Sequence, residues 1–175
     1  TSWPKPIEVL TEMDQYARLC GASAGRAQYR AALDADRVVQ TARAEIARLI
    51  HAPGPESISL HSSGTAALNA AIHGIVQKGD HVVTTAAEHN SVLRPIHFLQ
   101  TELDIDVTIV RCDRSGRVDM ADVMDAVRPH TRLVAVTHAS NVTGAVQPIQ
   151  SLASQLQSHP AMLLCDAAQT FGYLP

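Results

Sequence analysis

The chain has 175 residues, enough for a globular domain with its own core. Hydrophobic residues make up 46% of the sequence and charged residues 18%, a balance typical of folded proteins and unlike that of disordered ones. The formal net charge of −3 supplies no basic surface. Nucleic acids and anionic membranes are therefore poor candidates for partners, and the charge balance favours small-molecule ligands.

Targeting signals and cysteine frameworks have no support in the sequence. No apolar stretch reaches the ~20 residues of a membrane-spanning helix. The first residues, Thr1–Pro6, lack the basic start and apolar centre of a signal peptide, so we expect a cytoplasmic protein. The three cysteines, Cys20, Cys112 and Cys165, are widely spaced and form no C-x-x-C pair. We expect packed, reduced thiols and neither a disulfide framework nor a metal site.

Apolar residues at helical spacing predict two helices in the first part of the chain. One covers residues 6–19 and begins at a proline, and the other covers residues 27–51 and ends before a Pro-Gly-Pro segment. The side chains of the second helix that are expected to face inward are those of Leu33, Val38, Ala42, Ile46 and Leu49.

From residue 57 onward, short β-branched or leucine-rich runs alternate with helical patterns. The runs predict strands at residues 57–61, 81–85, 107–110, 133–137 and 162–165. The patterns between them predict helices at residues 65–76, 92–103, 120–127 and 148–157. This alternation is typical of an α/β fold with a mostly parallel sheet and helices on both faces.

Ligands of such sheets bind beyond the carboxyl ends of the strands, where the sequence places polar segments at residues 62–65, 88–90, 138–141 and 166–169. The first segment leads into a helix, and its small residues suit a phosphate group, although simple N-capping by Ser or Thr also explains them. Neither G-x-G-x-x-G nor G-x-x-x-x-G-K-[ST] occurs, which argues against dinucleotide and P-loop sites.

The other strand-end residues have two interpretations each. His89 can stack on a planar ligand and move protons, or it can simply pack. Asn141 can bind a ligand or serve as a turn residue. Asp166, with Gln169 three residues later, can pair with a cationic ring nitrogen or a metal, or cap the next segment. Together, a phosphate turn, an imidazole, an amide and a carboxylate–glutamine pair match the needs of pyridoxal 5'-phosphate (PLP).

These motifs resemble those of the class V aminotransferase family of PLP enzymes (fold type I), most closely its cysteine desulfurase and selenocysteine lyase branch. The matching segments are residues 63–69, 88–95, 138–144 and 166–169. The resemblance implies the following roles: Gly64, Thr65 and Ala66 hold the phosphate, His89 stacks on the ring as the catalytic residue, Asn141 approaches the substrate or a ring oxygen, Asp166 pairs with the pyridine nitrogen, and Gln169 pairs with the phenolic oxygen.

Part of the family's machinery has no match. The family binds PLP through a lysine in a Ser-Gly-His-Lys type segment downstream of Asp-x-x-Gln, whereas the lysines here are Lys5 and Lys78. The family's nucleophilic cysteine and carboxylate-binding arginine also belong to that downstream region. We therefore expect a fragment, with residues 1–52 as an N-terminal helical segment and residues 53–175 as part of the PLP-dependent transferase-like large domain. Any PLP is expected to bind noncovalently.

The resemblance also implies a reaction and partners. The family reaction converts L-cysteine to L-alanine and leaves the sulfur on an enzyme persulfide; the chain alone is expected to be inactive. An amino-acid substrate, a homodimer and, for the full-length protein, a sulfur-acceptor protein follow from it. Alternatives are a non-catalytic PLP-binding or dimerisation module and another class V activity, such as transamination, kynurenine cleavage or epimerisation. A nicotinamide-dependent reductase and a metal hydrolase are disfavoured by their missing motifs.

Overall fold

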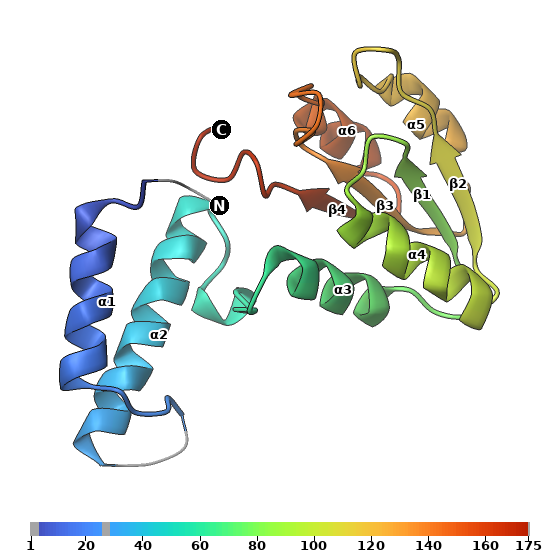
Figure 1. Cartoon of the computed structure of the whole chain (residues 1–175). Helices are drawn as coiled ribbons and strands as arrows, with labels where there is room; N and C mark the ends of the chain where they lie inside the picture. Colours follow the sequence, from blue (N-terminus) through green and yellow to red (C-terminus); the bar gives the residue numbers. More distant parts are fainter. Residues whose placement is uncertain (1–3, 26–28, 175) are drawn as a thin grey trace. The chain divides into compact units, whose positions relative to one another are not determined.

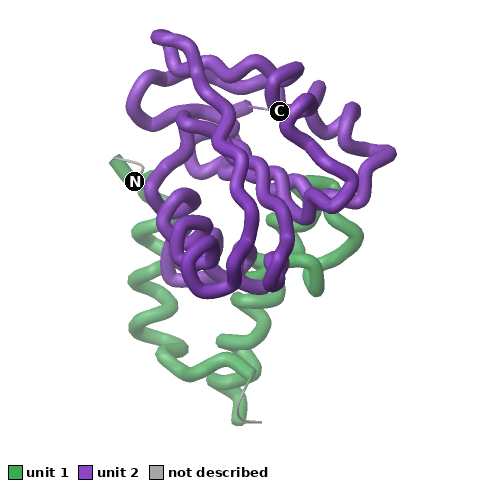
Figure 2. Tube along the Cα trace, turned by 90° about the vertical axis from the view of Figure 1, so that its right-hand side faces the viewer, with its two compact units in different colours: residues 1–60 green, residues 61–175 purple. Residues whose placement is uncertain are grey.

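The computed structural model describes residues 4–25 and 29–174, and the chain divides into two compact units. Unit 1 is residues 1–60 and unit 2 is residues 61–175 (Figure 2). Unit 1 contains the helices α1 (Ile7–Leu19) and α2 (Arg30–Leu49), followed by the short 3-10 helix η1 (Pro55–Ser57). No helix within the described ranges is both long enough and apolar enough to cross a lipid bilayer.

Helix α2 buries other side chains than expected. Its buried residues are alanines: Ala32, Ala35 and Ala47. Leu33, Val38 and Leu49 are 46%, 54% and 55% exposed, Ala42 is exposed and Ile46 is half-buried. The prediction that these five side chains face inward was therefore wrong for all of them except Ile46. Helical periodicity locates an apolar stripe, but the described residues leave the larger side chains of this helix uncovered.

The strand expected at residues 57–61 is also absent from the described structure. Residue 57 ends η1, and residues 58–61 take part in neither a strand nor a bridge, although Ile58 has extended backbone angles and a buried side chain. A run of alternating residues becomes a strand only when it pairs with a neighbouring strand. The hydrogen-bonded neighbours of the four strands below do not include this segment.

Unit 2 is built on a four-stranded parallel sheet with the order β2-β1-β3-β4 (Figure 1). The strands are β1 (His81–Thr85), β2 (Asp106–Val110), β3 (Thr131–Thr137) and β4 (Met162–Asp166). The helices are α3 (Gly64–Ile75), α4 (Asn90–Glu102), α5 (Met120–Ala126) and α6 (Ile149–Leu156). All eight elements occur where the sequence pattern predicts them.

The two central strands send alternate side chains to opposite faces of the sheet. Val82 and Leu133 belong to a core cluster with residues of α3 and α4. Their neighbours Val83 and Val134 belong to a second cluster with residues of α5 and α6. This period of two buries both faces under helices, which confirms the predicted α/β fold with a parallel sheet.

The order of the strands determines where a ligand fits. Strand β1 pairs with β2 on one side and with β3 on the other, so the chain changes direction across the sheet between β1 and β3. In open parallel sheets, a crevice forms at the carboxyl ends of the strands at such a switch point. The residues at these ends are Thr85, Thr137 and Asp166.

Candidate functional site

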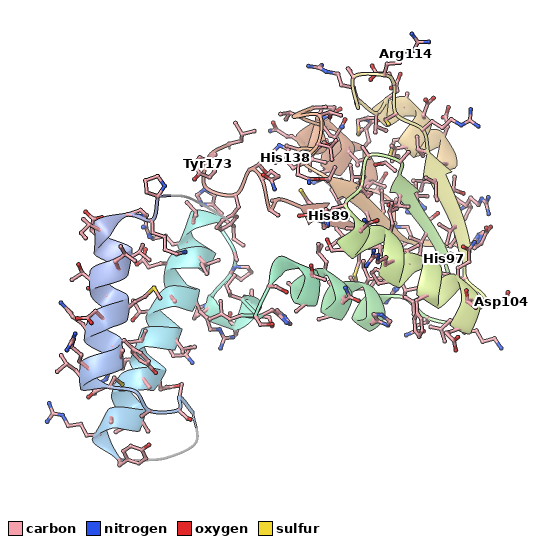
Figure 3. The ribbon with its side chains drawn as sticks, in the orientation of Figure 1. His89, His97, Asp104, Arg114, His138 and Tyr173 are labelled. Carbon is pink, nitrogen blue, oxygen red and sulfur yellow. The ribbon has the colours of Figure 1, made fainter. Side chains whose placement is uncertain are left out.

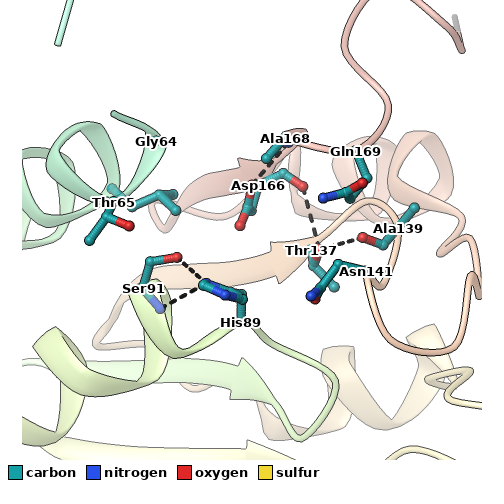
Figure 4. A pocket seen from close by; sticks show the side chains of 11 residues that line it. Gly64, Thr65, His89, Ser91, Thr137, Ala139, Asn141, Asp166, Ala168 and Gln169 are labelled. Atoms are coloured by element: carbon teal, nitrogen blue, oxygen red, sulfur yellow. Dashed lines mark hydrogen bonds between the residues drawn. The ribbon is translucent and has the colours of Figure 1, made fainter. Parts of the chain in front are cut away.

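A pocket of about 210 Å³ lies at this edge of unit 2 (Figure 4). Its lining consists of Gly64, Thr65, Leu68, His89, Ser91, Thr137, Ala139, Asn141, Asp166, Ala168 and Gln169. The fold thus brings together, in one pocket, all of the site residues predicted from the sequence except Ala66. They come from the start of α3, from the end of β4 and from the segments that follow β1, β3 and β4.

The start of α3 offers backbone amides to the pocket. Ser63 is the N-cap of the helix, and its Oγ accepts a hydrogen bond from the backbone N–H of Ala66 at 3.1 Å. Ala66 is thereby engaged within the chain and does not line the pocket. The amides of Gly64 and Thr65 precede the first intrahelical bonds and remain available to a ligand.

The space beside Gly64 is open. Apart from its chain neighbours and the backbone of its own helix, a Cβ atom built on this glycine would meet no atom of the described residues within 4 Å, and its backbone does not require a positive φ. Neither packing nor backbone conformation in the described structure therefore demands glycine here. Close approach of a ligand to the helix N-terminus is a physical reason for a missing side chain.

His89 is held rigidly at the N-cap of α4. Its Nδ1 accepts the backbone N–H of Ser91 at 3.1 Å, and the Ser91 hydroxyl lies 2.6 Å from the same nitrogen. A ring nitrogen that accepts an N–H carries no proton, so the proton of the neutral imidazole lies on Nε2. His97 belongs to the same helix but does not line the pocket (Figure 3). The arrangement favours a stacking or donating role for His89 over proton abstraction at Nε2.

Asp166 presents a buried carboxylate at the end of β4; its exposed fraction is 9%. Oδ1 accepts the backbone N–H of Ala168 at 3.0 Å, and none of the described residues donates a hydrogen bond to Oδ2. The main-chain oxygen accepts the N–H of His138 at 2.9 Å, which fixes this turn against β3. In Figure 4, Asp166 and His89 come from different strand ends and border the same space. One carboxylate oxygen is therefore available to a cationic group in the pocket.

Asn141 and Gln169 are exposed residues on the rim of the pocket. The loop that carries Asn141 is held by Ser140, whose Oγ accepts the N–H groups of Val142 and Thr143 at 3.2 and 3.3 Å. Asn141 is therefore not the residue that closes the turn through its side chain. Its amide and that of Gln169 are free to bind a ligand's oxygen atoms, as far as the described residues are concerned.

Glu88 is a site residue that the sequence analysis missed. Its exposed fraction is 8%, and Oε1 accepts hydrogen bonds from Thr85 Oγ1 at 2.6 Å and from the backbone N–H of Thr137 at 2.8 Å. Oε2 is buried and has no hydrogen-bond partner among the described residues. Burial, with a smaller contribution from the charge of Asp166, raises the pKa of Glu88 to about 7, although the two hydrogen bonds lower it. In the sequence, the signal that could have identified Glu88 is its position between β1 and His89.

The thiols and the ammonium groups lie outside the pocket. Burial, followed by the charges of Asp166 and Glu88, raises the pKa of Cys165 to about 11, so this thiol is a poor nucleophile at neutral pH. Lys78 lies in the turn before β1, at the amino end of the sheet, and Lys5 belongs to unit 1. Neither lysine lines the pocket.

Comparison with known proteins supports the predicted resemblance. The family model described as aminotransferase class-V matches residues 1–175. A probable cysteine desulfurase of Methanothermobacter thermautotrophicus is 36% identical over 172 residues, which cover 98% of this chain and 42% of that protein. The cysteine desulfurase IscS of Dictyoglomus turgidum is 38% identical over 141 residues, 78% of this chain and 35% of the relative. The chain thus spans less than half the length of these relatives.

Solved structures of similar proteins share the fold. A structure of SspA in complex with cysteine gives a TM-score of 0.86 at 30% identity and covers 96% of this chain and 49% of that one. The apo cysteine desulfurase of Thermococcus onnurineus NA1 gives a TM-score of 0.85 at 29% identity, over 95% of this chain and 42% of that one. Since the family model matches it from end to end, the chain belongs to the class V aminotransferases, a PLP-dependent family that includes the cysteine desulfurases.

Proposed function

We propose that this chain supplies the PLP cradle of a cysteine desulfurase, an enzyme that takes L-cysteine as its substrate. The observation that carries the proposal is the gathering of Gly64, Thr65, His89, Asn141, Asp166 and Gln169 around one pocket. Relatives named cysteine desulfurase and the cysteine bound to SspA support the choice of substrate.

The residues present fit the phosphate end of PLP. The amides of Gly64 and Thr65 stand at the positive end of the α3 dipole, and the space beside Gly64 is open. The Thr65 hydroxyl adds a donor at the same place. In the proposal these groups hold the phosphate dianion and thereby set how deep the cofactor sits.

The residues also fit the ring end. PLP, when bound, supplies an electron sink for negative charge at the Cα of an amino acid. The role of Asp166 is to pair with the ring nitrogen through Oδ2 and to keep it protonated. His89 covers one face of the ring, orients it and excludes water. Gln169 donates to the phenolic oxygen, and Asn141 donates to the substrate or to a ring oxygen.

A second candidate for the isolated chain is reversible PLP binding without turnover. The observation that favours it is that the pocket has no lysine among its lining residues. In the absence of an amine that binds the cofactor covalently, the charge pairs and the stacking contact carry all of the affinity. The two candidates share the cradle and differ in whether the chain releases sulfur from cysteine.

The proposal extends to a cytoplasmic homodimer that passes sulfur to an acceptor protein. No residue of α1 is buried, and Ile7 and Met13 are 69% and 59% exposed. Exposed apolar side chains such as these support a contact between two copies of the chain. Sedimentation velocity at micromolar concentration tests it, and a single monomer peak would count against it.

Titration of PLP into the chain tests the cradle. Asp166→Ala removes the charge-assisted hydrogen bond to the ring nitrogen, which typically costs about 1.5–3 kcal/mol, or roughly 10- to 100-fold in affinity. Asp125→Ala, at an exposed position of α5 that does not line the pocket, is the matched control. Equal affinity of the wild type and Asp166→Ala would refute the proposed site.

A further inference from the structure

The carboxyl group of Glu88 joins two parts of the pocket wall. Thr85, which donates its hydroxyl to Oε1, ends β1, and Thr137, which donates its backbone N–H to the same oxygen, ends β3. Glu88 also directly precedes His89 in the chain. This carboxyl group therefore links the His89 segment to the end of β3, in addition to the pairing of β1 with β3.

A second cavity, of about 400 Å³, borders Glu88 on its other side. It shares His89 and Asn141 with the first pocket, and Cys112 lines it as well. The charged and titratable groups around Glu88 are thus its neighbour His89, Asp166 and Cys165 from β4, and Cys112 from the segment after β2. The described structure places no cation against it.

When Glu88 is a neutral acid, its proton lies on Oε2. Oε1 already accepts two hydrogen bonds, so a proton on that oxygen would lose one of them. Oε2 is buried and has no partner within the described chain, so neither its O–H nor its ionised form is satisfied there. An oxygen closed to water and without a partner among the described residues favours the neutral acid over the carboxylate.

We propose that Glu88 is a positioning residue of this site: as a neutral carboxylic acid it ties the His89 segment to the end of β3, and it gives up its Oε2 proton when the charge of Asp166 is neutralised. In that step the O–H bond of Oε2 breaks, its electron pair stays on the carboxylate, and the proton passes to solvent water. A cation on Asp166 removes a negative charge that opposes ionisation of Glu88. The link to the cofactor rests on the proposed function.

A measurement without cofactor tests the coupling between the two carboxyl groups. The side-chain carbonyl carbon of Glu88 is followed by NMR against pH in the wild type and in Asp166→Asn, and Glu88→Gln identifies the signal. We expect the wild-type signal to change near pH 7 and the Asp166→Asn signal to change at lower pH. A signal that titrates like an exposed glutamate, or one that Asp166→Asn leaves unmoved, overturns the proposal.

A second measurement brings in the cofactor. Calorimetry of PLP binding at pH 7, in buffers with different ionisation enthalpies, counts the protons exchanged. The wild type should release more protons than Glu88→Gln; the titration of PLP itself cancels in this difference. Glu88→Gln keeps the acceptor for Thr85 and Thr137 and should bind within about threefold of the wild type, whereas Glu88→Ala should bind about tenfold more weakly.

The outcomes separate the two proposals. Equal proton counts for the wild type and Glu88→Gln overturn the role of Glu88 even if PLP binds tightly. Failure of every variant to bind PLP overturns the proposed function, and the NMR titration then still decides whether Glu88 is a neutral acid coupled to Asp166. A Glu88→Ala variant that binds PLP as tightly as the wild type shows that the tie does not position the site.

Discussion

Thr137 donates its backbone N–H to Oε1 of Glu88 over 2.8 Å, although 49 positions separate the two residues in the sequence. The bond spans the switch point of the sheet, because Glu88 follows β1 and Thr137 ends β3. It requires a buried carboxyl group whose second oxygen has no partner in the described part of the chain. Such a group is common at functional sites and uncommon in a core built only for stability.

Glu88→Gln should change how stability depends on pH. The folded pKa of about 7 lies above the ordinary value of 4.5, so the folded state holds the proton more tightly, and the wild type loses stability as the pH rises from 4.5 through 7. The gap corresponds to about 3 kcal/mol. Glu88→Gln lacks this loss and should exceed the wild type in free energy of unfolding at pH 8 but not at pH 4.5.

Urea unfolding curves at several pH values measure this difference. Glu102→Gln, at an exposed position at the end of α4, serves as the control and should follow the wild type throughout. A constant difference in stability between the wild type and Glu88→Gln across the whole pH range would mean that the pKa of Glu88 is the same in the folded and the unfolded protein.

Gly64→Ala should separate stability from binding. The added Cβ meets no atom of the described residues outside its own helix and its chain neighbours within 4 Å, so the free energy of unfolding should not fall. PLP affinity should nevertheless fall by about tenfold or more, because the methyl group occupies the space beside the amides proposed to bind the phosphate. Gly74→Ala, at an equally open position of the same helix outside the pocket, should leave affinity unchanged.

His89→Asn and His89→Ala should differ from each other in stability but not in PLP binding. Asn can replace the cap that Nδ1 provides to the N–H of Ser91, whereas Ala cannot and should cost about 1 kcal/mol. Both variants lose the ring and should bind PLP weakly. Thermal unfolding and PLP absorbance measure the two effects, and tight binding by His89→Asn would exclude stacking as the role of His89.

The chain on its own should release no sulfide from cysteine above background, even with PLP added. Lys5 and Lys78 lie outside the pocket, so no lining residue can bind the cofactor covalently or act as an amine base. Borohydride treatment followed by mass spectrometry should find no PLP attached to the chain. A reduced adduct on either lysine, or sulfide release that Asp166→Ala abolishes, would contradict this expectation.

The periodic parts of the fold are visible in the sequence. A change from helical spacing to short β-branched runs locates every strand and helix of unit 2, and the rule that parallel strands end at one edge of a sheet is enough to group six of the pocket residues. The segment at residues 57–61 has the same alternation but forms no strand, because pairing depends on distant residues.

Glu88 shows the same difference between local and long-range information. Its position after β1 is local, but its hydrogen bond comes from Thr137, 49 positions away, and the charge that adds to its raised pKa comes from Asp166, 78 positions away. Leu33 and Val38 of α2 are a second case: spacing predicts an apolar stripe, and only tertiary packing decides whether it is covered.

The pocket draws its walls from residue 64 at one end and residue 169 at the other, so no short stretch of the chain contains even half of it. The site consequently forms only when the sheet of unit 2 is complete, and the unfolded chain retains no weaker version of it. A ligand held there acts as a folding ligand: at a free concentration 100 times its Kd it adds about 2.7 kcal/mol to stability. Scarcity of PLP would then shorten the lifetime of the chain against proteases.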